Sequence, residues 1–235
     1  MRLELVSTDS MARVYRIAVG QKAGTGFVVE EEGKYYLLTA KHLFEAVEYP
    51  NKFNIGIEKN SSWDEFDANI YYHHNTDIDI AVIQTSYFDD MNFAKVRYDS
   101  KKLFVSQSVY MLGYPYGIKN RLLSAELDFP YPIVKRGVYS GVIVPNGNIV
   151  HVIDWNGNPG FSGGPVIYHS YNDEDDFEEE FIAGIISSGH THETKVLKPE
   201  QQETECYINE ESGIGFVYTI ENALEIIREY VRLAT

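Results

Sequence analysis

The sequence predicts an all-β protein that ends in one α-helix, on three observations. Short apolar or alternating runs recur along the 235 residues, and turn residues rich in Gly, Pro, Asn and Asp separate them about every ten positions. Aromatic residues make up 14% of the chain, and their flat rings pack well on half-buried pleated surfaces. Only the last stretch of the chain has helical periodicity. This combination is typical of antiparallel β-barrels.

The N-terminal strands are expected to lead to a histidine and an acid. After a first strand at Val14–Val19, a hairpin is predicted by two apolar runs, 24–29 and 34–40, that are joined at Glu31-Glu32-Gly33. The second run continues directly into Lys41-His42-Leu43-Phe44, so His42 is expected where a buried strand gives way to a short helical turn. Further strands are expected at 53–57, at 68–72 and, directly after Asp79, at 80–84.

The second half of the chain is expected to form another lobe. A loop-like segment, 86–100, is the predicted link between lobes 1–98 and 99–235, which together make one domain. Strands are expected at 108–112, 134–144, 149–153, 165–168, 181–189 and 213–218, with a turn at 113–117 and a long polar segment at 190–212. The closing helix is predicted to begin after Thr219 as its cap, with one apolar face made of Ile220, Ala223, Leu224, Ile227 and Val231.

Composition limits the classes of partner and location. The formal net charge of −15 argues against a nucleic-acid or membrane partner, because those surfaces attract clustered Lys and Arg. Cys206 is the single cysteine, which rules out an intrachain disulfide and leaves the fold to its packing. The first ten residues contain no apolar run of the kind found in signal peptides, and no later run approaches a membrane span. A cytoplasmic location is therefore expected.

The chemistry is expected to centre on residues 157–166, Gly-Asn-Pro-Gly-Phe-Ser-Gly-Gly-Pro-Val. The glycines and prolines predict a tight bend immediately before a strand, which would hold Ser162 rigidly. The N–H groups of Gly160 and Ser162 are candidates for an oxyanion hole. An ordinary Gly-rich turn is the alternative, since a serine hydroxyl is a poor nucleophile without a base and an orienting acid elsewhere.

His42 and Asp79 supply that base and that acid in the predicted mechanism. His42 would take the Ser162 proton, and Asp79 would hold the imidazole in the required tautomer. The chain order His, Asp, Ser is one of the few known for such a triad. Asp77 competes with Asp79 because both have the same strand parity, but the apolar strand begins directly after Asp79, which favours that residue.

Three segments carry a family resemblance: Thr39-Ala40-Lys41-His42, Asp79-Ile80-Ala81-Val82-Ile83 and Gly160-Phe161-Ser162-Gly163-Gly164-Pro165-Val166. They resemble the signature segments of trypsin-like (chymotrypsin-fold) serine peptidases, with the greatest similarity to bacterial HtrA/Deg-type peptidase domains. The predicted triad residues lie 37 and 83 positions apart, in the family's order. Supporting similarities at 24–29, 113–117 and 213–217 extend the resemblance over nearly the whole chain.

The resemblance implies two six-stranded antiparallel Greek-key barrels, with His42 and Asp79 from the first and Ser162 from the second. It implies a serine endopeptidase that cleaves protein or peptide substrates through an acyl-enzyme intermediate, without a cofactor. Gly160 and Ser162 would supply the oxyanion hole. Ser187, Ser188 and Gly189 match the strand that pairs with the substrate backbone, and Asn156 matches the floor of the specificity pocket.

Two departures from the family pattern qualify these expectations. Asn156 is neutral, so a preference for Lys or Arg has no counter-ion, and a neutral or small residue is expected before the scissile bond. Phe161 stands where digestive members carry an acid that pairs with a new N-terminus, so the oxyanion loop must be shaped by packing or by an activating partner. A catalytically silent or partner-activated peptide-binding module is the alternative function. A PDZ domain is not expected, and the oligomeric state stays open.

The remaining polar clusters are expected to be structural or solvated. His190, His192 and Glu193 form an H-x-H-E pattern but lack a visible fourth ligand, and adjacent residues such as His73 and His74 point apart on a strand. No metal site is therefore predicted. The acidic residues at 173–176 and 178–180 are expected to form a solvated hairpin tip, and Cys206 has no basic neighbour to activate it.

Overall fold

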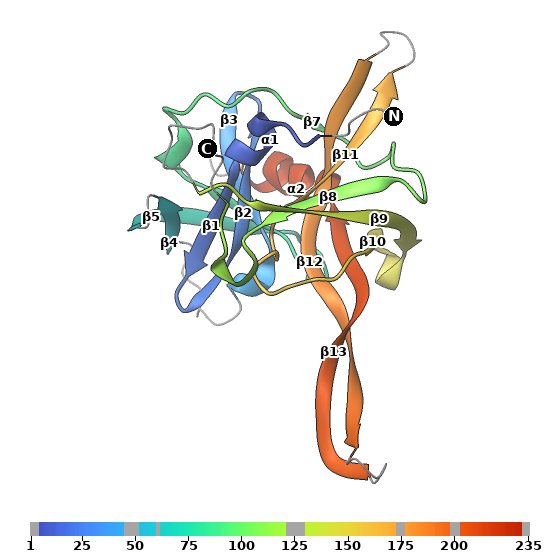
Figure 1. Ribbon diagram of the computed structural model, residues 1–235. Coiled ribbons are helices and arrows are strands. Elements are labelled where there is room, and N and C mark those ends of the chain that lie inside the picture. Colours follow the sequence, from blue (N-terminus) through green and yellow to red (C-terminus); the bar gives the residue numbers. More distant parts are fainter. Residues whose placement is uncertain are drawn as a thin grey trace.

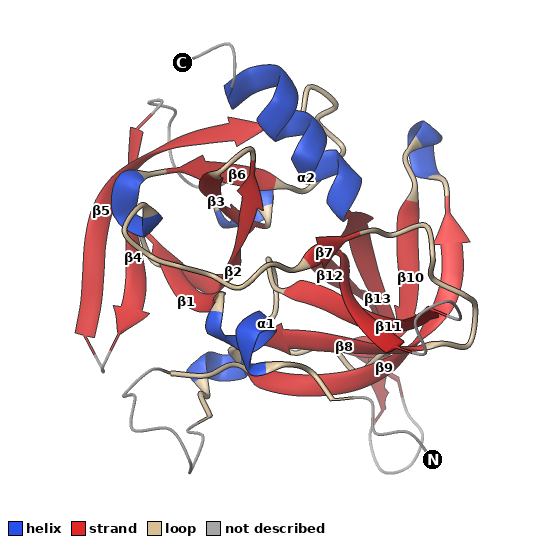
Figure 2. Cartoon of the chain, turned by 90° about the horizontal axis from the view of Figure 1, so that it is seen from above, coloured by secondary structure: helices blue, strands red, loops and turns tan. Residues whose placement is uncertain are grey.

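Two β-structures lie side by side with the C-terminal helix against both (Figures 1 and 2). This computed structural model describes residues 5–44, 52–59, 62–120, 130–172, 177–197 and 203–231. Among those residues, no helix has the length and apolar character needed to cross a membrane. The predicted division into lobes 1–98 and 99–235 stays a prediction.

The first structure is a closed barrel of six antiparallel strands in the order β1-β2-β3-β6-β5-β4. Its hairpin forms where predicted: Glu31 pairs with Lys34, and Glu32 and Gly33 between them have φ values of 52° and 74°, as a type I′ turn requires. Ile17, Leu37 and Ile55 are fully or almost fully buried inside the barrel. The strands are β1 (Val14–Val19), β2 (Lys22–Glu31), β3 (Lys34–Thr39), β4 (Lys52–Lys59), β5 (Ser62–Tyr72) and β6 (Ala81–Gln84).

The second structure is a seven-stranded sheet in the order β11-β8-β9-β10-β13-β12-β7, in which β11 also pairs with β12. It departs from the expected all-antiparallel six-stranded barrel because β7, inside the segment predicted as a loop, joins β12 in parallel. The second barrel therefore stays a prediction. The strands are β7 (Arg97–Tyr98), β8 (Ser108–Gly113), β9 (Ile133–Ile143), β10 (Val150–Asp154), β11 (Pro165–Asn172), β12 (Phe177–Leu197) and β13 (Glu203–Thr219).

The polar segment 190–212 belongs largely to the long ribbon of β12 and β13, which extends well beyond the body of the molecule (Figure 1). The two strands pair from Gly184 and Thr219 outward to Leu197 and Glu203. Cross-strand polar contacts occur along it, including one from Thr194 Oγ1 to Glu210 Oε2 at 2.9 Å. The sequence does not reveal these strands because neither face of the ribbon is buried, so no apolar alternation is required.

The C-terminal helix α2 (Ile220–Ile226) packs across the junction of the two β-structures and continues into a π-helical turn, Ile227–Val231. Ile220, Ala223, Leu224 and Ile227 of its predicted apolar face are buried, and they belong to one core cluster with Leu38 and Val82 of the barrel and Ile182 of the sheet. The side chain of Val231 lies outside the described part of the chain. Thr219 occupies the predicted N-cap position, but its side chain makes no capping hydrogen bond. The other helices are α1 (Thr8–Ala12) and the 3₁₀ turns Lys41–Leu43, Ser86–Phe88, Pro115–Gly117 and Pro145–Gly147.

The expectation of a solvated acidic tip is wrong for Glu180, while residues 173–176 lie outside the described residues. The Glu180 side chain is only 15% exposed. It accepts hydrogen bonds from Ser7 N–H at 2.9 Å, from Ser7 Oγ at 2.8 Å and from Ser10 Oγ. Burial alone would raise the pKa of Glu180, but hydrogen bonds from His169, Ser10 and Ser7 lower it overall. Glu180 therefore anchors α1 to β12 as a carboxylate.

We predict that Glu180→Gln lowers the unfolding free energy at pH 7 by about 1–3 kcal/mol, because charge-assisted hydrogen bonds are lost. The folded-state pKa of Glu180 lies below its unfolded value of about 4.3. Its stabilisation is therefore complete above that value and is lost as the pH falls through the folded pKa. Urea unfolding of the wild type and of Glu180→Gln measures this loss. The difference between their unfolding free energies should narrow as the pH falls below about 4.3.

The matched control is Glu65→Gln, which removes an exposed carboxylate from β5. It should leave the unfolding free energy nearly unchanged across the same pH range. If the unfolding free energies of the wild type and Glu180→Gln differ by the same amount down to pH 3, Glu180 is not an ionised anchor.

Candidate active site

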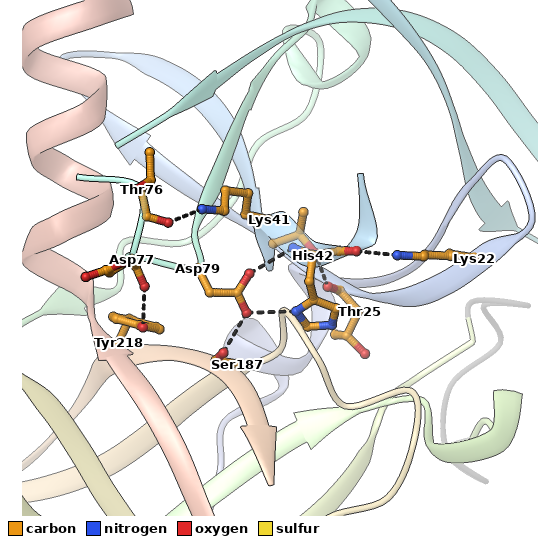
Figure 3. Close-up of polar contacts among 10 residues, drawn as sticks. Lys22, Thr25, Lys41, His42, Thr76, Asp77, Asp79, Ser187 and Tyr218 are labelled. Atoms are coloured by element: carbon orange, nitrogen blue, oxygen red, sulfur yellow. Dashed lines mark hydrogen bonds and ion pairs between the residues drawn. The ribbon is translucent and has the colours of Figure 1, made fainter. Parts of the chain in front are cut away.

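His42 and Asp79 meet at one edge of the first barrel because of strand register. Thr39, the last residue of β3, pairs with Ala81, the first residue of β6. His42 follows β3 in a 3₁₀ turn and Asp79 precedes β6, so both lie at the same end of this strand pair. His42 Nδ1 lies 2.7 Å from Asp79 Oδ2, and His42 N–H donates to Asp79 Oδ1 at 2.8 Å (Figure 3).

Ser187 is a third donor to Asp79. Its hydroxyl lies on β12 and donates to Asp79 Oδ2 at 2.5 Å. Burial alone would raise the pKa of Asp79, but hydrogen bonds from His42 and Ser187 lower it overall. The ionised carboxylate therefore favours the His42 tautomer that carries its proton on Nδ1 and leaves Nε2 as an acceptor. The sequence assigned Ser187 only to substrate pairing and missed this contact.

Asp77, the competing acid, is exposed and has other partners. Its Oδ2 accepts a hydrogen bond from Asn146 Nδ2 at 2.9 Å. Figure 3 shows its other contact, in which the Asp77 carbonyl accepts a hydrogen bond from Tyr218 Oη at 2.5 Å. The structure thus brings His42 together with Asp79, whereas Asp77 fixes the loop to the second β-structure.

Thr25 of β2 holds the loop that carries Ser162. Its N–H donates to the Ser162 carbonyl at 2.9 Å, and its Oγ1 donates to the Gly160 carbonyl at 2.6 Å. The Thr25 carbonyl in turn accepts from Thr39 Oγ1 at 2.7 Å, and the residue is fully buried. Sequence reasoning missed this role, although Thr25 lies within the segment 24–29 that carries part of the resemblance.

The Ser162 loop also contacts the segments that carry His42 and Ser187. A Cβ at Gly163 would lie 2.8 Å from Ala40 N, two residues before His42. Gly163 N–H donates to the Ile186 carbonyl at 2.7 Å, directly before Ser187. The three elements therefore converge on one place. Among the described residues, however, no hydrogen bond joins the Ser162 hydroxyl to the His42 ring.

The backbone of the loop leaves two particular N–H groups without an acceptor. Phe161 N–H donates to the Asn158 carbonyl at 3.3 Å, and Gly164 N–H donates to the Phe161 carbonyl at 2.8 Å. The N–H groups of Gly160 and Ser162 have no acceptor in the described part of the chain. The Pro159 carbonyl accepts from Tyr116 N–H at 2.8 Å, so in a trans peptide the Gly160 N–H points to the opposite side.

Packing holds Phe161 in this loop. Its side chain is 1% exposed and meets the Trp155 ring edge-to-face at 4.9 Å between centroids. The Lys135 ammonium lies 5.8 Å from the centroid of the Phe161 ring, donates to Asn158 Oδ1 at 3.0 Å and donates to the Asn156 carbonyl. Burial lowers the pKa of Lys135. Nothing in the sequence pattern singles out Lys135.

The predicted substrate-binding residues lie beside this loop and on β12. The Asn156 side chain is exposed, and its carbonyl is bound by Lys135. Ser188 pairs with Phe216, and Gly189 with Gly215, at the base of the β12–β13 ribbon. Ser188 is exposed and Gly189 is partly buried.

The H-x-H-E pattern lies on the ribbon rather than in a loop. His190 Nδ1 contacts Ser212 Oγ at 3.0 Å, and His192 Nε2 lies 3.4 Å from Glu210 Oε2. Across the described ranges, the one group of three side chains whose ligand atoms are close enough to share a metal ion is His73, His74 and Glu225. It lies outside the predicted catalytic set.

Comparison with known proteins identifies the family. Residues 24–173 match the trypsin-like peptidase domain. The active form of the Rv3671c protease from M. tuberculosis has a TM-score of 0.57 and 16% identity, over 94% of this chain and 81% of that chain. The HtrA-type protease AlgW with tripeptide has a TM-score of 0.56 and 18% identity, over 97% of this chain and 64% of that chain. No curated protein matches the chain.

The match to the family covers well over half of the sequence, and the two solved structures share its fold. It includes all three segments on which the sequence-based resemblance rests, with His42, Asp79 and Ser162 inside it. The chain belongs to the trypsin-like peptidase domain family.

Proposed function

We propose that this chain is a serine endopeptidase that hydrolyses peptide bonds of protein substrates through an acyl-enzyme intermediate. Ser162 Oγ attacks the scissile carbonyl while its proton passes to His42 Nε2. His42 then donates that proton to the departing amine. In the second half of the reaction, water attacks the acyl-enzyme while His42 takes its proton, and His42 then returns a proton to Ser162 Oγ. Asp79 holds the imidazole orientation and stabilises the imidazolium, a role supported by its two hydrogen bonds from His42.

The observation that carries this proposal is the selective pairing of N–H groups around Ser162. In the described residues, Phe161, Gly163 and Gly164 donate to backbone carbonyls, whereas Gly160 and Ser162 do not. A pair of unengaged, preorganised donors suits the oxyanion of a tetrahedral intermediate. The outward Pro159 carbonyl, bound to Tyr116, supports an arrangement in which the Gly160 N–H faces the substrate.

We also propose that the sheet of the second lobe acts as the second barrel of this fold. The pairing of β11 with β12 supports this interpretation, because it links strands that are not neighbours in the sheet order. Two lobes would then contribute to one site, with Ser162 from the second lobe held against β2 of the first by Thr25.

A peptide-binding module on the same fold is the second candidate. The observation that favours it is the lack of a hydrogen bond between the Ser162 hydroxyl and His42 within the described residues. It does not exclude catalysis, because catalytic hydrogen bonds are often long before substrate binds. Turnover separates the two candidates: a binding module captures peptides without cleaving them.

We predict that Ser162→Ala abolishes labelling by a fluorophosphonate and lowers kcat for peptide cleavage by on the order of 10⁶-fold, because the nucleophile is lost. The fold should persist, since the Ser162 hydroxyl makes no hydrogen bond with the described residues, and thermal unfolding should confirm this. Fluorescent labelling on a gel and a quenched peptide substrate provide the two measurements.

Ser140→Ala is the matched control, because Ser140 is an exposed serine on β9. It should be labelled and should cleave peptide at the wild-type rate. Equal labelling of Ser162→Ala and wild type would exclude Ser162 as the nucleophile. Measurable peptide affinity without labelling or turnover in the wild type would instead favour the binding module.

We predict that Lys135 positions the oxyanion loop. Lys135→Met should lower kcat about tenfold, the loss expected for a slightly misplaced oxyanion donor. KM should change less, and Lys135→Arg should restore part of the rate by retaining the cation over Phe161. The control is Lys102→Met, which removes an ammonium 4.9 Å from the centroid of the Phe181 ring. Equal losses of kcat in both methionine variants would indicate a general packing effect.

We predict a neutral or small residue immediately before the scissile bond. Asn156 offers no negative charge, and the Lys135 ammonium bound to its carbonyl places a positive charge beside it, which disfavours a cationic side chain. Profiling cleavage of a peptide library measures this preference. A strong preference for Lys or Arg would overturn the assignment of Asn156 as the pocket floor.

A further inference from the structure

His73, His74 and Glu225 form a cluster at the side of α2. His73 and His74 directly follow β5, and their rings lie 4.2 Å apart between centroids. The expectation that they point apart is wrong, because the alternation of side chains stops where the strand ends. Glu225 Oε1 lies 3.6 Å from His73 Nε2 and 4.0 Å from His74 Nδ1.

The buried member of this cluster has an unused nitrogen. The His73 side chain is 6% exposed, and its Nε2 has no hydrogen-bond partner. Glu225 Oε1 is the carboxylate oxygen that faces it, but 3.6 Å is too long for a hydrogen bond. A buried polar atom without a partner is uncommon, and a bound ion would satisfy this one.

We propose that His73 Nε2, His74 Nδ1 and a Glu225 carboxylate oxygen bind a zinc ion. The three ligand atoms lie within 4.8 Å of one another, whereas a tetrahedral zinc site with bonds of about 2.0–2.1 Å separates its ligands by about 3.4 Å. The required contraction falls on His74 and Glu225, whose side chains are 56% and 43% exposed and free to adjust.

Glu229 is placed to supply the fourth ligand. It lies four residues after Glu225, and its Oε2 is 3.9 Å from His74 Nδ1. Two neutral imidazoles and two carboxylates balance the charge of one divalent ion. Imidazole nitrogen favours zinc over magnesium or calcium, which prefer sites made of oxygen alone.

Zinc binding also changes which His73 nitrogen carries the proton. His73 Nδ1 accepts a hydrogen bond from Asn75 N–H at 3.0 Å, so the neutral ring holds its proton on Nε2. A zinc ion needs the Nε2 lone pair and moves that proton to Nδ1, where it faces the Asn75 N–H. The hydrogen bond from Asn75 must therefore break when zinc binds.

Asn75 links this change to the loop that ends at Asp79. Its side-chain Oδ1 accepts from Asp77 N–H at 3.0 Å, and its carbonyl accepts from Ile78 N–H at 3.2 Å. Asp79 is the next residue. Zinc binding should therefore shift the backbone of residues 75–79, whether or not the chain is a peptidase.

Calorimetric titration with zinc chloride tests the site. The wild type should bind one ion per chain, and His73→Ala, His74→Ala and Glu225→Gln should each weaken binding about tenfold or more. If His73→Ala does not fold, the zinc affinities of His74→Ala and Glu225→Gln still test the site, because both side chains are exposed. His192→Ala, which removes an exposed histidine 3.4 Å from Glu210 on the ribbon, should bind zinc as the wild type does, and magnesium chloride should not bind. Affinity unchanged in His74→Ala and Glu225→Gln would overturn the site.

Backbone amide spectra in Ser162→Ala test the linkage without turnover. On addition of zinc chloride, the Asn75 and Asp79 amide signals should shift, and that of Ser140 should not. Tight binding that leaves the 75–79 signals in place would overturn the linkage. Failure of Ser162 as nucleophile would leave both zinc results unaffected, so the two proposals fail separately.

Discussion

The hydrogen bonds of Thr25 to the carbonyls of Gly160 and Ser162 determine how the candidate site is assembled. They join a buried residue of the first barrel to a loop 135 residues later in the chain. Every polar group of Thr25 is used, since its carbonyl accepts from Thr39 Oγ1 and its Oγ1 also accepts from Tyr114 N–H at 3.2 Å. A buried polar side chain is stable only when it is satisfied in this way. The loop position therefore depends on its hydrogen bonds to the first barrel rather than on the loop alone.

The glycines around Ser162 follow from that close approach. Gly163 has a φ of 85°, and a Cβ there would lie 2.1 Å from both Thr25 O and Thr39 Oγ1. At Gly160, with a φ of 106°, a Cβ would lie 2.3 Å from Tyr114 O. Both positions exclude larger residues on steric and conformational grounds. The same glycines that mark the serine as a nucleophile candidate are thus required for the backbone to approach the first barrel this closely.

Residues that lie beside the ends of apolar strands could be predicted from the sequence. Contacts that depend on how segments far apart in the chain pair could not. His42 and Asp79 could be predicted because His42 follows one apolar run and Asp79 directly precedes another. Those two runs form neighbouring strands, β3 and β6. Ser187 reaches Asp79 over 108 residues, which no local pattern encodes. The β12–β13 ribbon was hidden for another reason: a strand solvated on both faces has no apolar period. Glu180 looked like part of a solvated run because its partners come from the other end of the chain.

Phe161 changes the physical basis on which the oxyanion loop is held. An acid at this position would depend on a cationic partner and on pH, whereas an aromatic ring buried against Trp155 depends on contact area and shape. The Lys135 ammonium lies beside this packing, and it interacts with the ring face and with loop oxygens. A newly formed amino terminus would therefore find no counter-ion at Phe161. In this chain the shape of the loop follows from the packing of Phe161, Trp155 and Lys135, together with the Thr25 hydrogen bonds.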